Sequence, residues 1–386
     1  MIHKIIPFIF ILFTIFQTPF LCGENTMPES IIRVSIVKNT SQINLQSPSG
    51  FLIFDLNTGE KKRFNESVKY LIQTENKKIL IDKISFSAWI RIIPLNEQYP
   101  LTINERKYRD TVLIRCDAPE KITAINEIDI DHYLYGILPK EVGFSWPLET
   151  LKAQAIVSRT FALKNLKRHE SEGFNLCNEV HCQVFGGLEG EKPETNIAVD
   201  QTHNEVLIYK KDIINSFFFA NCGGRTETSY SVWEGGNPLP YLQSIRCKYC
   251  SKSKHFEWKS FISQKEISEI LKKKYPKIQE PIQSIKIKNK SKSGRVTYLQ
   301  IQHANGKIQI KSAHFRQYLG AEKIKSTLIT SIKKNKNGFN FNGKGWGHGV
   351  GFCQDGAKGL GDKGKNYKQI LKHYFPKASI EKVSDD

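Results

Sequence analysis

Apolar and polar residues alternate in short runs along the first third of the chain. Such runs occupy 32–37, 50–55, 78–81 and 109–115, and turn residues separate them. Because successive side chains of a strand point to opposite faces, this pattern predicts an antiparallel sheet with one buried face. We therefore expect a small β-rich N-terminal domain over 28–116, in which no chemical motif is evident.

A helical pattern replaces the alternation after residue 130. Pro139 has no backbone N–H to donate and restricts the residue before it, so a first helix is expected over 130–138, with Glu141 on the following turn. A second helix should begin at 145–147, where Ser and Pro suit the cap and the first turn, and run for about 18 residues. Its many alanines favour close packing.

The rest of the chain mixes strand-like and helix-like runs. Strands are expected at 122–128, 205–209, 213–220, 284–288, 296–302 and 307–311, and helices at 265–274, 312–319, 354–360 and 367–375. These elements predict an α+β fold with mixed, mostly antiparallel sheets and a helical segment, preceded by the small β-rich domain. We place the larger domain at 120–377 and a C-terminal tail at 378–386.

The N-terminus predicts export. An apolar run from Ile5 to Phe16 follows Lys4, and it is too short to span a membrane comfortably, so residues 1–23 are interpreted as a secretory signal peptide. A retained leader that anchors the protein, or lipidation of Cys22, are the alternatives. We expect a location in the periplasm or cell envelope, with only peripheral contact to membrane or wall.

The composition is strongly basic, with 57 Lys and Arg against 38 Asp and Glu and a formal net charge of +19. Such a charge would suit nucleic acid. The lysines are scattered, however, and no nucleic-acid-binding motif accompanies them. For an exported protein, anionic wall polymers and lipid headgroups are the favoured partners, and we expect no nucleic acid partner.

Three motifs surround the two expected helices: Tyr-Leu-Tyr-Gly-Ile-Leu-Pro-Lys-Glu-Val at 133–142, Trp-Pro-Leu-Glu-Thr-Leu-Lys-Ala-Gln-Ala at 146–155 and Ser-Arg-Thr-Phe-Ala-Leu at 158–163. A fourth, Gly-Trp-Gly-His-Gly-Val-Gly-Phe-Cys-Gln-Asp-Gly-Ala, occupies 345–357. These motifs resemble the SpoIID/LytB family, and the resemblance extends over about two thirds of the chain. That family includes a sporulation lytic transglycosylase and a cell-wall amidase enhancer, so the resemblance implies peptidoglycan glycan strands, and an amidase as a second candidate partner.

Glu141 is the candidate catalytic residue. Glycoside hydrolysis normally uses two carboxylates. A lytic transglycosylase needs one, because the C6 hydroxyl of the muramic acid attacks the anomeric carbon and gives a 1,6-anhydro product. Glu141 stands at the family's catalytic Pro-x-Glu position, so the resemblance implies that it serves as general acid and then as general base. Without that motif, it would be interpreted as a surface residue.

Five residues are candidates for contact with the glycan: Gln154, Arg159, Trp346, His348 and Gln354. Gln154 and Arg159 could bind sugar hydroxyls or hold Glu141, and Arg159 could equally form a structural ion pair. Trp346 could stack on a sugar face, and His348 could contact substrate or support the catalytic carboxylate. The glycines at alternate positions of 343–351 suit one wall of a groove, or a packed turn with a satisfied histidine.

Cysteine and histidine spacing predicts zinc. Cys177, His181 and Cys182, with His169 upstream, offer two thiolates and two imidazoles, which suit a tetrahedral zinc ion. A disulfide between Cys177 and Cys182 is the competing interpretation, since export brings an oxidising environment. Zinc is favoured, and it would be structural because four protein ligands leave no open position. No organic cofactor is expected.

A second set consists of Cys222, Cys247, Cys250 and Cys353. These four thiols could bind a second metal ion or form two disulfides, and the sequence does not separate the two possibilities.

The leading hypothesis is an exported peptidoglycan lytic transglycosylase that cleaves glycan strands, including strands stripped of peptide, with Glu141 as the single acid and base. The alternative is a non-catalytic module that binds peptidoglycan and recruits or stimulates a wall amidase.

Overall fold

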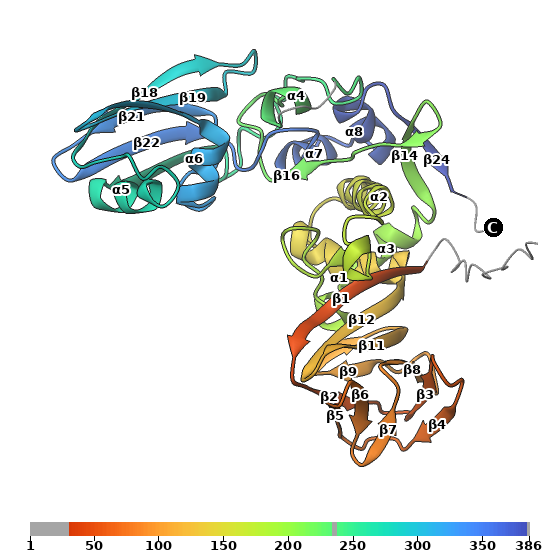
Figure 1. Cartoon of the computed structure of the whole chain (residues 1–386). Coiled ribbons are helices and arrows are strands. Elements are labelled where there is room, and N and C mark those ends of the chain that lie inside the picture. The colour runs from red at the N-terminus through yellow and green to blue at the C-terminus, as the bar shows by residue number, and fades with distance from the viewer. Residues whose placement is uncertain (1–30, 234–237, 384–386) are drawn as a thin grey trace, which may run out of the picture.

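The alternating N-terminal pattern forms two sheets, and the helical pattern forms a layer beside them (Figure 1). The computed structural model describes residues 31–233 and 238–383. Its mostly antiparallel sheets and segregated helices confirm the α+β prediction. The signal peptide and Cys22 lie outside the described residues.

A seven-stranded sheet has the strand order β13-β1-β12-β11-β8-β3-β4. Its members are β1 (Ile31–Thr40), β3 (Phe51–Asp55), β4 (Lys61–Phe64), β8 (Trp89–Pro94), β11 (Thr111–Ala118), β12 (Lys121–Asp129) and β13 (Leu176–Cys177). A six-stranded sheet, β10-β9-β2-β5-β6-β7, packs nearby. It contains β2 (Gln42–Gln46), β5 (Tyr70–Glu75), β6 (Lys78–Ile81), β7 (Ile84–Phe86), β9 (Leu101–Ile103) and β10 (Arg106–Tyr108). Alternate residues such as Ile32, Val34, Ile43 and Leu45 are fully buried in a shared core, as the two-residue repeat requires.

The turn at 119–120 lies inside one sheet. β12 pairs antiparallel with both β11 and β1. The N-terminal strands and the first strand of the expected larger domain therefore form a single hydrogen-bonded sheet, and the division at 116–120 stays a prediction.

Five helices form the middle of the molecule: α1 (Ile130–Glu141), α2 (Leu148–Lys164), α3 (Pro193–Asp200), α7 (Gln354–Gly361) and α8 (Tyr367–Tyr374). Helix α2 is buried on two sides. Ala155 and Ala162 face the N-terminal core, whereas Ala153, Ile156 and Val157 face a second core with α7 and α8. The small side chains allow this double packing, as the alanine content indicated.

Helix α1 corrects one expectation. It continues through Pro139, and Glu141 is its last residue rather than part of a turn. The last turn still closes, because the backbone N–H of Val142 donates to the carbonyl of Leu138 at 3.0 Å. A proline this close to the end of a helix removes few hydrogen bonds. Helix α2 begins where it was expected, but its N-cap is Pro147 and no side chain caps it.

Residues 257–344 form a separate lobe (Figure 1). In the sequence, this lobe directly precedes the glycine-rich segment. Its sheets are β17-β22-β21 and β18-β19-β20. They consist of β17 (Glu257–Ser263), β18 (Ile282–Lys290), β19 (Val296–His303), β20 (Gly306–Lys311), β21 (Ile329–Lys334) and β22 (Gly338–Lys344), with helices α5 (Gln264–Lys272) and α6 (Ser312–Leu319). The lobe has its own apolar core, which includes Trp258, Leu299 and Phe341.

Small sheets close the middle part. β14 (Glu205–Tyr209) lies between β15 (Asp212–Ile213) and β24 (Ser379–Lys382), and β16 (Phe218–Phe219) pairs with β23 (Phe352–Cys353). Residues 379–382, expected in a tail, are thus a strand. The strand expected at 213–220 is wrong as a continuous element, since only its ends are paired. Short helical turns are η1 (Glu170–Glu172), η2 (Leu188–Gly190) and α4 (Ser229–Val232).

Within the described residues, no helix combines the length and the apolar character needed to cross a bilayer.

Candidate functional site

Glu141 lies at the C-terminal end of α1 and is half-buried. Burial raises the pKa of its carboxyl group, while a hydrogen bond from the backbone N–H of Val184 acts in the opposite direction. The negative end of the α1 dipole also disfavours the ionised form. The carboxyl group is therefore biased toward holding a proton, which is the state a general acid requires.

The segment that holds Glu141 comes directly after the cysteine and histidine cluster. Next to Cys182, Gln183 is buried, and its side chain contacts the hydroxyl of Tyr133 at 3.4 Å and the carbonyl of Ser158 at 3.5 Å. Val184 then supplies the backbone N–H for Glu141. The position of the carboxylate thus depends on how the loop before Gln183 is held.

The first cluster is assembled as its spacing predicted. One ligand atom from each of His169, Cys177, His181 and Cys182 lies within 4.8 Å of every other. The Cys182 sulfur lies 3.4 Å from Nε2 of His169 and 3.7 Å from Nδ1 of His181. Two thiolates and two imidazoles at this spacing form a donor set that fits tetrahedral zinc.

Glu172 supports this cluster and was not among the predicted site residues. Its carboxylate lies 2.5 Å from Nδ1 of His169 and also pairs with Lys38 of β1, and these contacts lower the pKa of Glu172 to about 2. A carboxylate on the outer nitrogen of a ligand histidine fixes the ring orientation. In the sequence, only the position of Glu172 three residues after His169 could have indicated this contact.

All seven cysteines in the described residues are free thiols, so no disulfide joins Cys177 to Cys182 here.

Two glutamines lie behind Glu141 rather than in an open groove. Gln154 is fully buried and Gln354 nearly so. The Gln354 amide lies 3.3 Å from the backbone carbonyl of Glu141 and 3.4 Å from the Gln154 side-chain oxygen. Both glutamines link the end of α1 to α2 and α7. This arrangement fits the second role considered for Gln154, which is to hold Glu141, and Gln354 shares that role.

Of the roles considered for Arg159, its contacts fit the structural ion pair rather than substrate binding. Arg159 is fully buried and forms an ion pair with Asp131 at 2.6 Å. It also donates to the carbonyls of Thr202 and Glu205 at 2.7 and 3.1 Å. Because every direction is occupied by protein, the guanidinium has no surface to offer a sugar.

The glycines of the glycine-rich segment pack against protein, while His348 between them lines a cavity of about 530 Å³. Gly345, Gly347, Gly349 and Gly351 all have positive φ angles, and a Cβ on any of them would lie within 2.7 Å of the backbone or side chains of 217–222 or of Arg295. Glycine is required here because the chain turns in the left-handed region and passes close to its neighbours.

His348 is satisfied by the backbone. Its Nε2 lies 3.0 Å from the carbonyl of Phe218, and its Nδ1 accepts the N–H of Val350 at 3.1 Å. Burial lowers the pKa of His348 to about 4, so the ring is neutral at pH 7. His348 thus fixes the turn. Trp346 carries the Lys325 ammonium over its ring, 4.2 Å from the centroid, and His255 at its edge, so one ring face is already covered.

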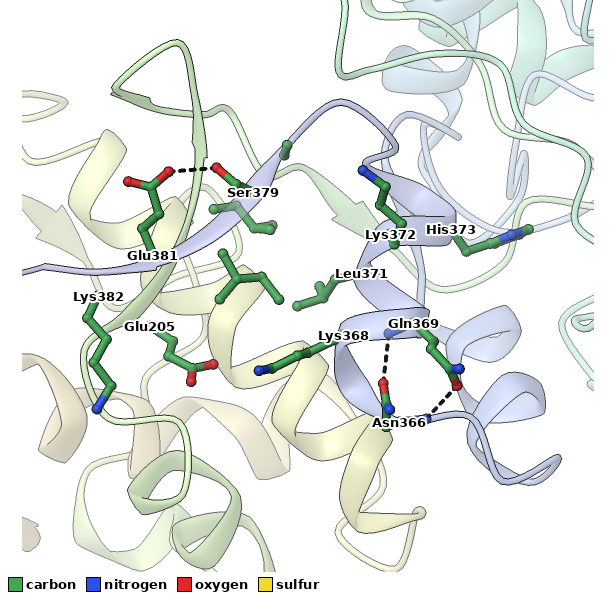
Figure 2. Close-up of a pocket in the computed structure, with 13 residues that line it drawn as sticks. Glu205, Asn366, Lys368, Gln369, Leu371, Lys372, His373, Ser379, Glu381 and Lys382 are labelled. Atoms are coloured by element: carbon green, nitrogen blue, oxygen red, sulfur yellow. Dashed lines mark hydrogen bonds between the residues drawn. The ribbon is translucent and has the colours of Figure 1, made fainter.

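A basic cavity of about 710 Å³ is lined by Trp146 from the segment between α1 and α2, and Glu141 itself is not among its lining residues. Its lining includes Trp146, which packs on Gly143, and Asp355, the neighbour of Gln354. Five lysines also line it: Lys248, Lys252, Lys254, Lys358 and Lys363. A second cavity, of about 830 Å³, lies between α8 and β24 (Figure 2) and contains none of the predicted site residues.

The second set of cysteines is also brought together. The sulfurs of Cys222, Cys247, Cys250 and Cys353 all lie within 4.8 Å of one another, and all four residues are buried.

Comparison with known proteins places this site in a family. Residues 118–209, which contain Glu141 and the first cluster, match the family model described as stage II sporulation protein, and 242–351 match a domain of unknown function. An uncharacterized protein of Brachyspira hyodysenteriae is 35% identical over 69% of this chain and 68% of its own length.

Two named relatives come from Bacillus. The amidase enhancer of Bacillus subtilis is 28% identical over 64% of this chain, which spans 40% of that protein's length. Stage II sporulation protein D of Bacillus amyloliquefaciens is 26% identical over 67% of this chain and 76% of its own length. The chain therefore belongs to the SpoIID/LytB family.

Proposed function

We propose that this protein acts on the cell wall outside the cytoplasmic membrane, as a lytic transglycosylase of peptidoglycan in which Glu141 is the single acid and base. The observation that carries the proposal is the state of Glu141. Its carboxyl group has a raised pKa because of burial rather than because of a neighbouring carboxylate. A lone carboxyl group with a raised pKa suits a reaction whose nucleophile belongs to the substrate.

The reaction balances without water. Glu141 donates its proton to the glycosidic oxygen as the bond from the anomeric carbon to that oxygen breaks. The carboxylate then accepts the proton of the muramyl C6 hydroxyl as that oxygen bonds to the anomeric carbon. The products are a shortened strand and a 1,6-anhydro-muramyl end, and Glu141 regains its proton.

The basic cavity supports glycan strands stripped of peptide as substrate. Removal of the stem peptide leaves a free lactyl carboxylate on each muramic acid. Five lysines line the cavity that contains Trp146, and four of them are exposed to solvent. Their positive charge attracts carboxylates. Trp146 offers an aromatic surface in the same cavity.

The first cluster is proposed as a structural zinc site. His169, Cys177, His181 and Cys182 would hold the ion, which would supply rigidity rather than a reactive position. The ion would affect the reaction only indirectly, by fixing the position of Gln183 and Val184, which connect the cluster to Glu141.

Mass spectrometry of digested glycan tests the proposal. Wild-type protein and the Glu141→Gln variant are incubated with intact and with peptide-stripped strands. We expect 1,6-anhydro products from wild type, more from stripped strands, and a loss of about 100-fold or more in the variant. Glu194→Gln, at an exposed position of α3, is the matched control and should keep full activity. Full activity of Glu141→Gln would contradict the assignment.

The amidase enhancer relative supports a second candidate, a binding module that stimulates a wall amidase. The same digests distinguish the two functions. An enhancer yields no anhydro product with any variant, and it accelerates an added amidase whether residue 141 is Glu or Gln.

A further inference from the structure

The second cysteine cluster is built from three segments that lie far apart in the sequence. Cys222 follows β16, Cys247 and Cys250 lie on the loop that leads to the separate lobe, and Cys353 ends β23 immediately before α7. Their exposed fractions are 0, 2, 1 and 0%, so this cluster is sealed from solvent. We propose that these four thiolates hold a structural zinc ion, a site distinct from the one beside Glu141.

The geometry fits one central ion. Zn–S bonds of about 2.3 Å in a tetrahedron place the sulfurs about 3.8 Å apart. The four sulfurs here all lie within 4.8 Å of one another, and those of Cys222 and Cys250 are 3.4 Å apart. Two disulfides would instead pair the sulfurs at about 2.0 Å. An iron–sulfur cube would hold the thiolates farther apart, because iron and sulfide lie between them.

Hydrogen bonds to the sulfurs favour thiolates. The backbone N–H of Cys222 donates to the Cys353 sulfur at 3.2 Å, and the Tyr374 hydroxyl lies 3.3 Å from the Cys247 sulfur. Donors of this kind surround metal-bound thiolates and tune their charge.

A buried cation provides an independent observation. Arg295 is 2% exposed and donates one hydrogen bond to the carbonyl of Cys222 at 2.9 Å, but its Nε and its other terminal nitrogen have no hydrogen-bond partner among the described residues. Cys222, Cys353 and Glu227 are close enough to act on it electrostatically. A buried cation is costly without nearby negative charge. Four thiolates around Zn²⁺ carry net negative charge and would offset it.

The ion would fasten the glycine-rich segment to the body of the protein. Cys353 precedes Gln354, which contacts the backbone of Glu141. Gly356 leaves no room beyond its Hα, since a Cβ there would lie 2.6 Å from the Cys247 sulfur. With four protein ligands the ion has no open position and is not catalytic. The site stands on its own and does not depend on the proposed reaction.

Metal analysis of the full chain tests the proposal. Zinc per chain is measured by plasma mass spectrometry for wild type, Cys250→Ser, Cys182→Ser and Cys116→Ser. We expect Cys250→Ser to lose about one equivalent of zinc relative to wild type, independently of the loss in Cys182→Ser. Cys116→Ser, at a thiol outside both clusters, should lose none.

A second measurement applies to wild type alone, so it does not depend on the folding of a variant. The protein is unfolded in chelator without reductant, alkylated and mapped by mass spectrometry. The proposal expects Cys222, Cys247, Cys250 and Cys353 to be alkylated as thiols and zinc to be released. Disulfides among these four residues, iron in place of zinc, or unchanged zinc in soluble Cys250→Ser would overturn it.

Discussion

At Glu141, burial and a backbone contact act on the same carboxyl group in opposite directions, and burial dominates. A carboxyl group whose pKa is raised keeps its proton to higher pH than an ordinary glutamate, and this favours its use as a general acid. The resemblance supplied the position, but only the packing around the end of α1 supplies the protonation state.

The raised pKa of Glu141 predicts two pH effects with known signs. The proton-donating form is lost as pH rises through the folded-state pKa, so glycan cleavage should decline on the alkaline side at a pH above the ordinary value of 4.5. The native state also binds this proton more tightly than the unfolded state, so its contribution to stability falls as pH rises through the same range.

Replacing Glu141 by Gln should remove the free-energy cost of burying an ionised carboxylate at this position. We expect the variant to have a melting temperature equal to or above that of wild type at pH 7, with the difference shrinking below pH 4.5, as measured by scanning calorimetry. A variant that is less stable than wild type at pH 7 would mean that the ionised carboxylate is the stabilising form.

At the scale of elements, the loop from His169 to Val184 connects the first cluster to Glu141. It docks on the sheet through β13, which pairs in parallel with β1, and it ends at the N–H that Glu141 accepts. His169 lies at the start of this loop and Cys182 lies near its end, and the cluster brings the two side chains together. Fixing the cluster therefore fixes the partner of the carboxylate.

Removal of the proposed first zinc ion should loosen this loop. For Cys182→Ser we expect loss of about one zinc equivalent, faster amide exchange over 176–184, and a drop of roughly 10- to 100-fold in cleavage. Hydrogen exchange measured by mass spectrometry beside metal analysis checks this. Unchanged exchange in a zinc-depleted protein would separate the cluster from the site.

At the scale of the whole molecule, the described residues form three large apolar cores and one small cluster, and α2 contributes to two of the large cores and to the small cluster. Arg159 reinforces that junction. From α2 it reaches Asp131 on α1 and the carbonyls of 199–205, which lead into β14 of the second core. A buried arginine with this many hydrogen-bond acceptors has a structural role, because it holds these elements together.

Arg159→Leu should therefore destabilise the protein by about 3–5 kcal/mol, because it removes the arginine partner of the buried Asp131 carboxylate and leaves the contact with the His203 ring in place. The double variant Arg159→Leu/Asp131→Asn should recover part of this loss. Replacing Lys152, whose partner Glu149 is one-third exposed, should cost no more than about 1 kcal/mol. Unfolding in urea measures all three, and a small effect of Arg159→Leu would contradict the structural role.

The sequence alone was sufficient for features that depend on neighbours along the chain. Two-residue alternation predicted the N-terminal strands, alanine content predicted the close packing of α2, and motifs identified the family and Glu141. Ligand types and spacing indicated which residues could form the two candidate metal sites. Local steric and hydrogen-bonding rules govern such features.

Tertiary structure decided everything that depends on what lies across a contact. Pro139 is tolerated inside α1 because the final turn closes around it, and Arg159 faces Asp131 rather than solvent. The alternate glycines allow residues 217–222 and Arg295 to approach the backbone closely, in the space where a sugar was expected. The chain order does not specify which distant groups share a buried space, and burial decides which charges, protons and hydrogen bonds a residue can keep.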